Sequence, residues 1–168
     1  LAVTGGDVLE FGAGSGKLAG DLIRALQKIG CEPRQYLILE PSPDLRERQN
    51  SFLQKEIPEW ISRVQWIDQL PKKFSGVMIA NEVLDAMPID LVSWQLDGIH
   101  ERGVAISGDD FKWADRMLAP GSLLDHVKNI SVSPGYVSEI HRAGAAFIRS
   151  VGDSLKHGAA LLIDYGFL

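Results

Sequence analysis

The stretch EFGAGSGK, residues 10–17, decides the fold because three glycines at alternate positions lie between an apolar run and a helical pattern. Residues 8–11 predict a short strand. After the glycines, Gly30 stands where a helix would end, and apolar residues recur before it at helical spacing: Leu18, Leu22, Leu26 and Ile29. The stretch therefore predicts a strand, a glycine-rich loop and a helix in succession.

The same alternation continues along the chain. Four further apolar runs predict buried strands, over residues 36–39, 64–67, 76–80 and 159–163. Ser42 and Pro43 predict the start of a helix that continues to about residue 55, and a long helical pattern covers residues 136 to about 156. This order predicts an α/β protein with a Rossmann-like core, whose mostly parallel sheet is covered by helices on both faces.

Residues 89–131 interrupt the alternation. Asp97-Gly98 is a strong two-residue turn signal between two runs of strand-forming residues, and it predicts a β-hairpin over residues 91–107. Residues 111–114 predict a third strand beside it. We therefore expect a small inserted β-hairpin region within a single domain that spans residues 1–168.

Composition excludes several classes of protein. The chain has 168 residues, 45% hydrophobic and 23% charged, which is typical of a globular domain. Its net charge of −5 argues against a broad nucleic-acid-binding surface, and no apolar run approaches the about 20 residues that span a bilayer. Cys31 is the only cysteine, which excludes an internal disulfide. Because the chain begins at Leu1 and stops just after a predicted strand, we expect an incomplete fragment of a longer protein.

The glycine loop has three candidate ligands. A phosphate-binding P-loop needs a serine or threonine after its lysine for the magnesium ion, but Leu18 follows Lys17. A dinucleotide fingerprint counted from Gly12 needs a third glycine at position 17, which is that lysine. The pattern that remains is E-x-G-x-G-x-G, which suits S-adenosylmethionine.

Two acidic residues support that interpretation. Glu10 precedes the first glycine and suits the ammonium group of S-adenosylmethionine, while bare glycine backbone lets the methionine part lie close to the loop. Glu40 ends the second predicted strand and could accept hydrogen bonds from both ribose hydroxyls. Because an acid at that position also suits NAD, Glu40 does not by itself distinguish the two cofactors. A glycine-rich turn without any ligand is the remaining alternative.

Four motifs together resemble the MidA-like family of class I methyltransferases: VLEFGAGSG, ILEPSPDLRERQ, ANEVLDAMP and LLIDYGF. That family includes a mitochondrial complex I assembly factor that methylates a protein arginine. The resemblance runs from Val8 to Phe167. It implies S-adenosyl-L-methionine as cofactor, S-adenosyl-L-homocysteine as product, and a protein substrate, with a respiratory complex I subunit among the candidates. It implies the cytoplasm for a bacterial protein and the mitochondrial matrix for a eukaryotic one. Because family members are longer, it also implies missing sequence on both sides of the chain.

The resemblance further implies the cofactor contacts. Asp68, after the third strand, would lie near the adenine amino group, and Asn81, after the fourth, near the sulfonium. Ile67 or Trp66 would pack on the adenine ring, although a tryptophan beside a strand belongs more often to the core. The complete set of predicted cofactor-binding residues is Glu10, Gly12, Ala13, Gly14, Gly16, Glu40, Asp68 and Asn81.

The predicted catalytic residues are Glu82 and Asp85, three positions apart just after the fourth strand. One helical turn there would place both carboxylates on one face, where they could orient a guanidinium in bidentate geometry. The alternative is that Asp85 caps a turn and Glu82 is an ordinary surface acid. Glu139 is a further candidate at the start of the predicted long helix, where the helix dipole explains it equally well.

Other chemistry receives less support. The four histidines lack the spacing of metal ligands, so no metal site is predicted. Tyr165, after the last strand, could line an acceptor pocket. Two alternatives to a methyltransferase stay open: a non-catalytic assembly or binding protein that keeps the cofactor fold, and an NAD-dependent oxidoreductase, against which the broken dinucleotide fingerprint argues.

Overall fold

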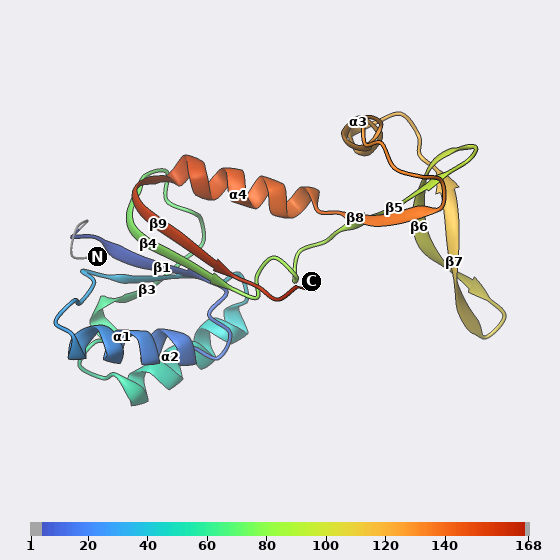
Figure 1. Ribbon diagram of the computed structural model, residues 1–168. Helices are drawn as coiled ribbons and strands as arrows, with labels where there is room; N and C mark the ends of the chain where they lie inside the picture. The colour runs from blue at the N-terminus through green and yellow to red at the C-terminus, as the bar shows by residue number, and fades with distance from the viewer. Residues whose placement is uncertain (1–4, 167–168) are drawn as a thin grey trace. The chain divides into compact units, whose positions relative to one another are not determined.

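The computed structural model describes residues 5–166 and divides into two compact units (Figure 1). One unit contains the chain up to Ala86 together with the segment from Ala146 onward. The other unit is Met87–Ala145. Predictions for residues 1–4 and 167–168 lie outside the described residues.

The first unit contains a five-stranded sheet in the order β3-β2-β1-β4-β9, with every neighbouring pair parallel. The strands are β1 (Asp7–Phe11), β2 (Tyr36–Leu39), β3 (Val64–Ile67), β4 (Phe74–Asn81) and β9 (Leu155–Ile163). The helices are α1 (Lys17–Lys28), α2 (Pro43–Glu56), the short 3-10 helix η1 (Ile61–Arg63) and α4 (Arg142–Ser154), most of which belongs to this unit. The predicted parallel α/β core is confirmed.

Helices cover both faces of this sheet (Figure 1). On one face, Ile23 of α1 and Leu53 of α2 are fully buried against apolar side chains of the sheet. On the other face, Val151 and Phe147 of α4 pack against the sheet, and the Phe147 ring meets the Phe11 ring edge-on at 4.9 Å between centroids. Burial of these side chains is the main force that holds the helices on the sheet.

The start of α2 follows from its local sequence. Ser42 is the N-cap residue, and its hydroxyl accepts a hydrogen bond from the Leu45 amide. Pro43 occupies the first turn, where its fixed φ suits a helix and its missing N–H costs nothing. The predicted helix start is confirmed, and α2 ends at Glu56.

The second unit contains a four-stranded antiparallel sheet in the order β7-β6-β5-β8. Its elements are β5 (Asp90–Gln95), β6 (Gly98–Ser107), β7 (Asp110–Met117), α3 (Ser122–Val127) and β8 (Tyr136–Ile140). Val92 and Val127 are fully buried in its own apolar cluster. The predicted hairpin at Asp97-Gly98 and the third strand beside it are confirmed.

The long helix predicted from residue 136 to about 156 is wrong at its start. Tyr136–Ile140 is a strand that pairs with β5, so Glu139 lies in a strand and not at a helix start. The helix begins at Arg142, and β9 already begins at Leu155. Helical periodicity and β-branched composition coexist in this segment, and pairing with a strand more than 40 residues away decides between them. The second unit therefore extends beyond the expected insertion at residues 89–131.

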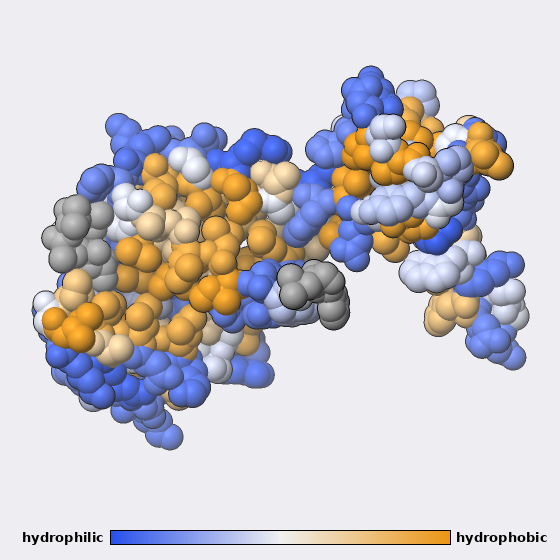
Figure 2. All heavy atoms as spheres, viewed as in Figure 1, coloured by the Kyte–Doolittle hydropathy of each residue, from blue (hydrophilic) through white to orange (hydrophobic). Residues whose placement is uncertain are grey.

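β9 forms an edge of the five-stranded sheet. Leu161 and Ile163 of β9 are 53% and 44% exposed, and Ile148 of α4 is 44% exposed. Figure 2 shows apolar residues gathered over the face of this unit where β9 and α4 lie.

Among the described helices, none has both the length and the apolar character that crossing a membrane requires.

Two glycines face each other across neighbouring strands. Gly158 of β9 pairs in register with Gly76 of β4, and both have positive φ, 138° and 144°. A Cβ added at Gly158 would lie 1.8 Å from the Gly76 carbonyl oxygen. Gly158 is therefore required by close backbone approach.

We expect Gly158→Ala to lower the free energy of unfolding by about 2–4 kcal/mol, through overpacking and backbone strain. Urea denaturation measures the change. Gly152→Ala is the matched control, because Gly152 lies in α4 with nothing within 4 Å of its added Cβ. There, alanine should stabilise the protein by about 0.5–1 kcal/mol. Equal effects at the two positions would contradict the packing argument.

Candidate functional site

The glycine loop joins the carboxyl end of β1 to the amino end of α1. Gly12, Gly14 and Gly16 all have positive φ, at 60°, 54° and 82°, which explains why this loop needs glycine at alternate positions. The Gly12 amide donates to the Leu39 carbonyl at 3.0 Å, which ties the loop to the end of β2. Gly12 and Gly14 are exposed, but Ala13 is buried in the core. The glycine backbone is therefore open to a ligand, and the Ala13 methyl group is not.

Glu10 lies on β1 and is only 2% exposed. Its Oε2 accepts a hydrogen bond from the Tyr36 hydroxyl at 2.7 Å. Burial raises the pKa of Glu10, and the Tyr36 hydrogen bond partly offsets this by stabilising the carboxylate. Glu10, the predicted contact for the ammonium group, is therefore already hydrogen-bonded to Tyr36 inside the protein. It lies one residue before the end of β1.

Glu40 follows the end of β2 and is 4% exposed. Its Oε1 accepts from the Ser42 amide at 3.1 Å, and its Oε2 accepts from Nε2 of Gln49 at 3.1 Å. Both donors belong to the start and middle of α2. The predicted ribose acceptor is therefore held in one orientation by the helix that follows it.

Asp68 lies at the end of β3 with its side chain 84% exposed. Its Oδ1 pairs with Nη1 of Arg46 at 2.8 Å, and the same guanidinium donates from Nη2 to the Ile67 carbonyl at 3.0 Å and from Nε to the Glu40 carbonyl. Arg46 therefore fixes the ends of β2 and β3 relative to each other. Trp66 is half-buried against the core beside α1 and α2.

The second group of predicted residues follows β4. Asn81 is the last residue of β4, is exposed, and pairs in register with Ile163 of β9. Glu82 and Asp85 do not lie on a helical turn as predicted. They lie in an irregular turn where Glu82 has a φ of 54° and its amide donates a hydrogen bond to the Ile163 carbonyl at 2.8 Å.

The turn nevertheless brings carboxylates together. One oxygen each of Glu82, Asp85 and Asp164 lies within 4.8 Å of the other two. Partial desolvation, and then the charges of Asp164 and Asp85, raise the pKa of Glu82. A hydrogen bond to Asp85 and its charge raise the pKa of Tyr165. This acidic cluster, defined as Glu82, Asp85 and Asp164, concentrates negative charge at the carboxyl ends of β4 and β9.

An acidic cluster of this kind suits cations. A planar guanidinium can pair with carboxylates through two hydrogen bonds, and a hard divalent cation also prefers carboxylate oxygens. The prediction of no metal site rested on the scattered histidines and did not consider these oxygen donors. All three carboxylates are exposed.

Two residues of the candidate site, one in the acidic cluster and one beside Glu40, were missing from the prediction. Asp164 directly follows β9, and the rule that ligands bind at the carboxyl ends of parallel strands could have added it. Gln49 carries no comparable signal, because a glutamine in the middle of a helix is usually a solvent-exposed residue. Only the packing of α2 on the sheet reveals that it is buried.

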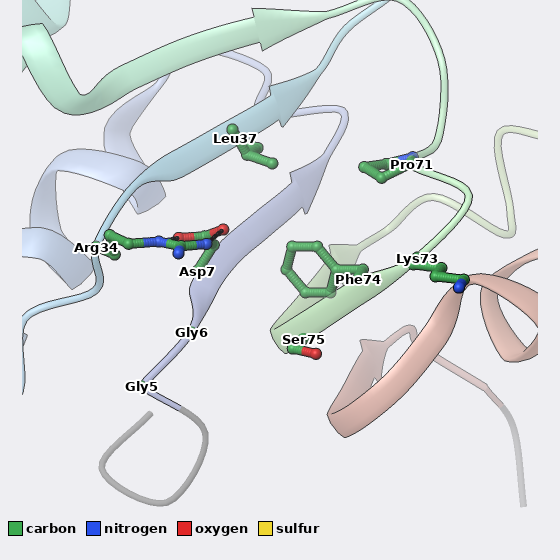
Figure 3. A pocket seen from close by; sticks show the side chains of 9 residues that line it. All are labelled: Gly5, Gly6, Asp7, Arg34, Leu37, Pro71, Lys73, Phe74 and Ser75. Carbon is green, nitrogen blue, oxygen red and sulfur yellow. Dashed lines mark hydrogen bonds and ion pairs between the residues drawn. The ribbon is translucent and has the colours of Figure 1, made fainter.

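A cavity of about 400 Å³ lies at the opposite end of the same sheet (Figure 3). It is lined by residues at the starts of β1 and β4, among them Asp7, Phe74 and Lys73. The Arg34 guanidinium forms two hydrogen bonds with the Asp7 carboxylate, at 2.9 and 3.1 Å. Because parallel strands direct their amino ends away from the glycine loop, this cavity is separate from the candidate site.

The fold and the strand-end site define a class I methyltransferase-like α/β protein. A family model described as "Putative S-adenosyl-L-methionine-dependent methyltransferase" matches residues 2–168, and the chain belongs to this family.

Two solved structures from Burkholderia thailandensis are similar to the chain. One is the native structure of a COG1565 superfamily protein, 46% identical over 99% of this chain, with a TM-score of 0.88. The other is a COG1565 superfamily member bound to S-adenosyl-homocysteine, 46% identical over 99% of this chain, with a TM-score of 0.87. This chain covers 45% and 44% of those proteins, so it spans less than half of their length. No curated protein sequence matches the chain significantly.

Burial of Glu10 predicts a pH effect on stability. Its pKa is raised in the folded state, so above the ordinary glutamate pKa the unfolded chain loses this proton more readily than the folded one. Glu10 therefore lowers the free energy of unfolding as pH rises toward its folded pKa. Glutamine at this position keeps a polar partner for Tyr36 but does not ionise.

We expect the stability of Glu10→Gln, relative to the parent, to increase as the pH is raised from 4 to 7. Urea denaturation at a series of pH values measures this difference. Glu47→Gln, at an exposed position of α2, is the matched control. An equal increase in the control would attribute the effect to net charge rather than to burial.

Proposed function

We propose that the chain binds S-adenosyl-L-methionine at the carboxyl ends of β1 and β2 and acts as a methyltransferase of the MidA-like family. The observation that carries the proposal is the exposed glycine loop, with three positive-φ positions, beside the buried Glu40 carboxylate on the neighbouring strand end. Membership of the putative S-adenosyl-L-methionine-dependent methyltransferase family and the similar protein bound to S-adenosyl-homocysteine support this proposal.

The residues fit the parts of this cofactor. Bare backbone at Gly12 and Gly14 lets a ligand approach closely, and Glu40 retains acceptor positions for the ribose hydroxyls because a carboxylate accepts about four hydrogen bonds. Asn81 would lie near the sulfonium, and Asp68, already paired with Arg46, would lie near adenine. When bound, the cofactor supplies an electrophilic methyl group on a sulfonium.

Replacing Glu40 tests the cofactor proposal. We expect the parent to bind S-adenosyl-homocysteine saturably and Glu40→Ala to bind about tenfold more weakly, because hydrogen bonds to a charged acceptor are lost. Isothermal titration calorimetry measures both affinities. The control is Glu47→Ala, the same change at an exposed residue of α2, which should bind like the parent. A folded parent without binding would contradict the cofactor assignment.

For the acceptor we propose a protein arginine, held by Glu82 and Asp85 together with Asp164. Methylation of a guanidinium needs one nitrogen aligned with the methyl group, and the product nitrogen must release a proton. Carboxylates that pair with the other nitrogens orient the group. Partial desolvation and neighbouring charges make Glu82 a stronger base than an isolated glutamate, so it suits uptake of that proton.

Isosteric substitutions test the acceptor proposal. We expect Glu82→Gln and Asp85→Asn to bind S-adenosyl-homocysteine like the parent but to lower kcat at least about 100-fold, since the orienting charge and base are lost. Transfer of a labelled methyl group to arginine-containing peptides measures the rate. Asp153→Asn, an exposed acid at the end of α4, is the control.

The outcomes separate a methyltransferase from the non-catalytic assembly protein that the sequence left open. Cofactor binding without transfer to any peptide would favour a non-catalytic assembly protein. Methyl transfer to lysine or carboxylate acceptors instead of arginine would support the methyltransferase proposal and contradict the proposed arginine acceptor. A respiratory complex I subunit as the partner, and the bacterial cytoplasm or mitochondrial matrix as the location, stay predictions that follow from the resemblance.

A further inference from the structure

Gln49 of α2 is fully buried, and both the nitrogen and the oxygen of its amide have hydrogen-bond partners. Nε2 donates to the Gly14 carbonyl at 3.0 Å and to Oε2 of Glu40 at 3.1 Å. Oε1 accepts from the indole N–H of Trp66 at 2.8 Å. One side chain therefore connects the glycine loop, the end of β2 and strand β3.

The surrounding groups specify an amide. Two of the three partners are acceptors and the third is a donor, so the side chain must offer two N–H groups on one atom and an acceptor on another. A glutamate would place an oxygen against the Glu40 carboxylate, and a methionine of similar length has no donor. The backbone of Gln49 is also close to the loop, because a Cβ added at Gly16 would lie 3.5 Å from the Gln49 Cα.

We propose that Gln49 is a positioning residue for the cofactor, and this rests on the proposed function. It holds the Glu40 carboxylate toward the position of the ribose hydroxyls and fixes the distance between that carboxylate and the Gly14 segment of the loop. The parts of the proposed site for the methionine and for the ribose are thereby joined through one helix. Preorganisation of this kind removes the entropic cost of ordering Glu40 when the cofactor binds.

A buried glutamine could also serve stability alone, since leaving its partners unsatisfied costs free energy whether or not a ligand binds. The two roles differ in their dependence on Glu40. A positioning residue that acts through Glu40 affects affinity only while Glu40 is present, whereas a purely structural residue affects affinity equally with and without it.

A double-mutant cycle makes this comparison. Affinity for S-adenosyl-homocysteine is measured by calorimetry for Gln49→Met, Glu40→Ala, the double variant and the parent, with thermal melting as the check of folding. We expect Gln49→Met to weaken binding about tenfold in the parent and less than twofold in the Glu40→Ala background. Gln54→Met, at an exposed position of the same helix, should leave affinity unchanged.

The near-isosteric Gln49→Glu gives a second readout that does not depend on tolerating methionine. Its carboxylate repels Glu40 at high pH, but once protonated it regains an O–H donor. We expect the ratio of its dissociation constant to that of the parent to fall as the pH is lowered from 8 to 5.5. A purely structural role predicts a constant ratio while the variant remains folded.

Equal loss of affinity in both Glu40 backgrounds, unchanged affinity of Gln49→Met, or a pH-independent ratio for Gln49→Glu would overturn the role of Gln49. These results all require a parent that binds S-adenosyl-homocysteine. A folded parent without binding would instead contradict the proposed function, and the role of Gln49 with it.

Discussion

The parallel pairing of β1 with both β2 and β4 is the constraint on which the candidate site depends. Phe11, the last residue of β1, lies in register with Leu39 on one side and with Ala80 on the other. The segments that follow these residues therefore leave the sheet at the same end, where the carboxyl ends of the strands lie. If one of these neighbours ran antiparallel, its following loop would lie at the other end of the sheet, next to the cavity at Asp7.

A buried polar group without a hydrogen-bond partner lowers the stability of the fold. At this end of the sheet, Glu10 and Glu40 both have partners nearby. Glu10 pairs with Tyr36, while Glu40 has the Ser42 amide and Gln49. Removal of one partner would leave the other buried and unpaired, which costs more than the net gain from forming the pair. These contacts hold the side chains in place before any ligand arrives, and such order in advance favours binding.

The proposed cofactor site at the carboxyl ends of β1 and β2 and the acidic cluster are built by different means. The carboxyl ends of β1 and β2 are held in place by two side chains of α2. Arg46 donates a hydrogen bond to the Ile67 carbonyl, and Gln49 donates one to the Gly14 carbonyl. The acidic cluster lies in a turn after β4 and at the end of β9, with exposed carboxylates close enough to raise the pKa of Glu82. A rigid strand-end site for a small cofactor and an open, charged surface for a large acceptor would suit the two halves of the proposed protein methylation.

The sequence alone determined the features that depend on a few neighbouring residues. Alternate glycines at 12, 14 and 16 specify a loop that needs positive φ, Ser42 and Pro43 specify a helix start, and Asp97-Gly98 specifies a hairpin turn. In each case the local backbone conformation depends on chain geometry that side-chain type controls directly. The predicted parallel core followed from the order of these local elements.

The tertiary structure decided whatever depends on partners distant in the chain. Residues 136–140 became a strand because β5 was available to pair with them, and Gly158 lies in a ladder because Gly76 faces it. Asp164 joined Glu82 and Asp85, 79 or more positions earlier, only through the pairing of β4 with β9. Gln49 became a buried link between loop and strand only through the packing of α2. Local periodicity carries no information about such contacts, because the free energy that selects them is gained only when distant segments meet.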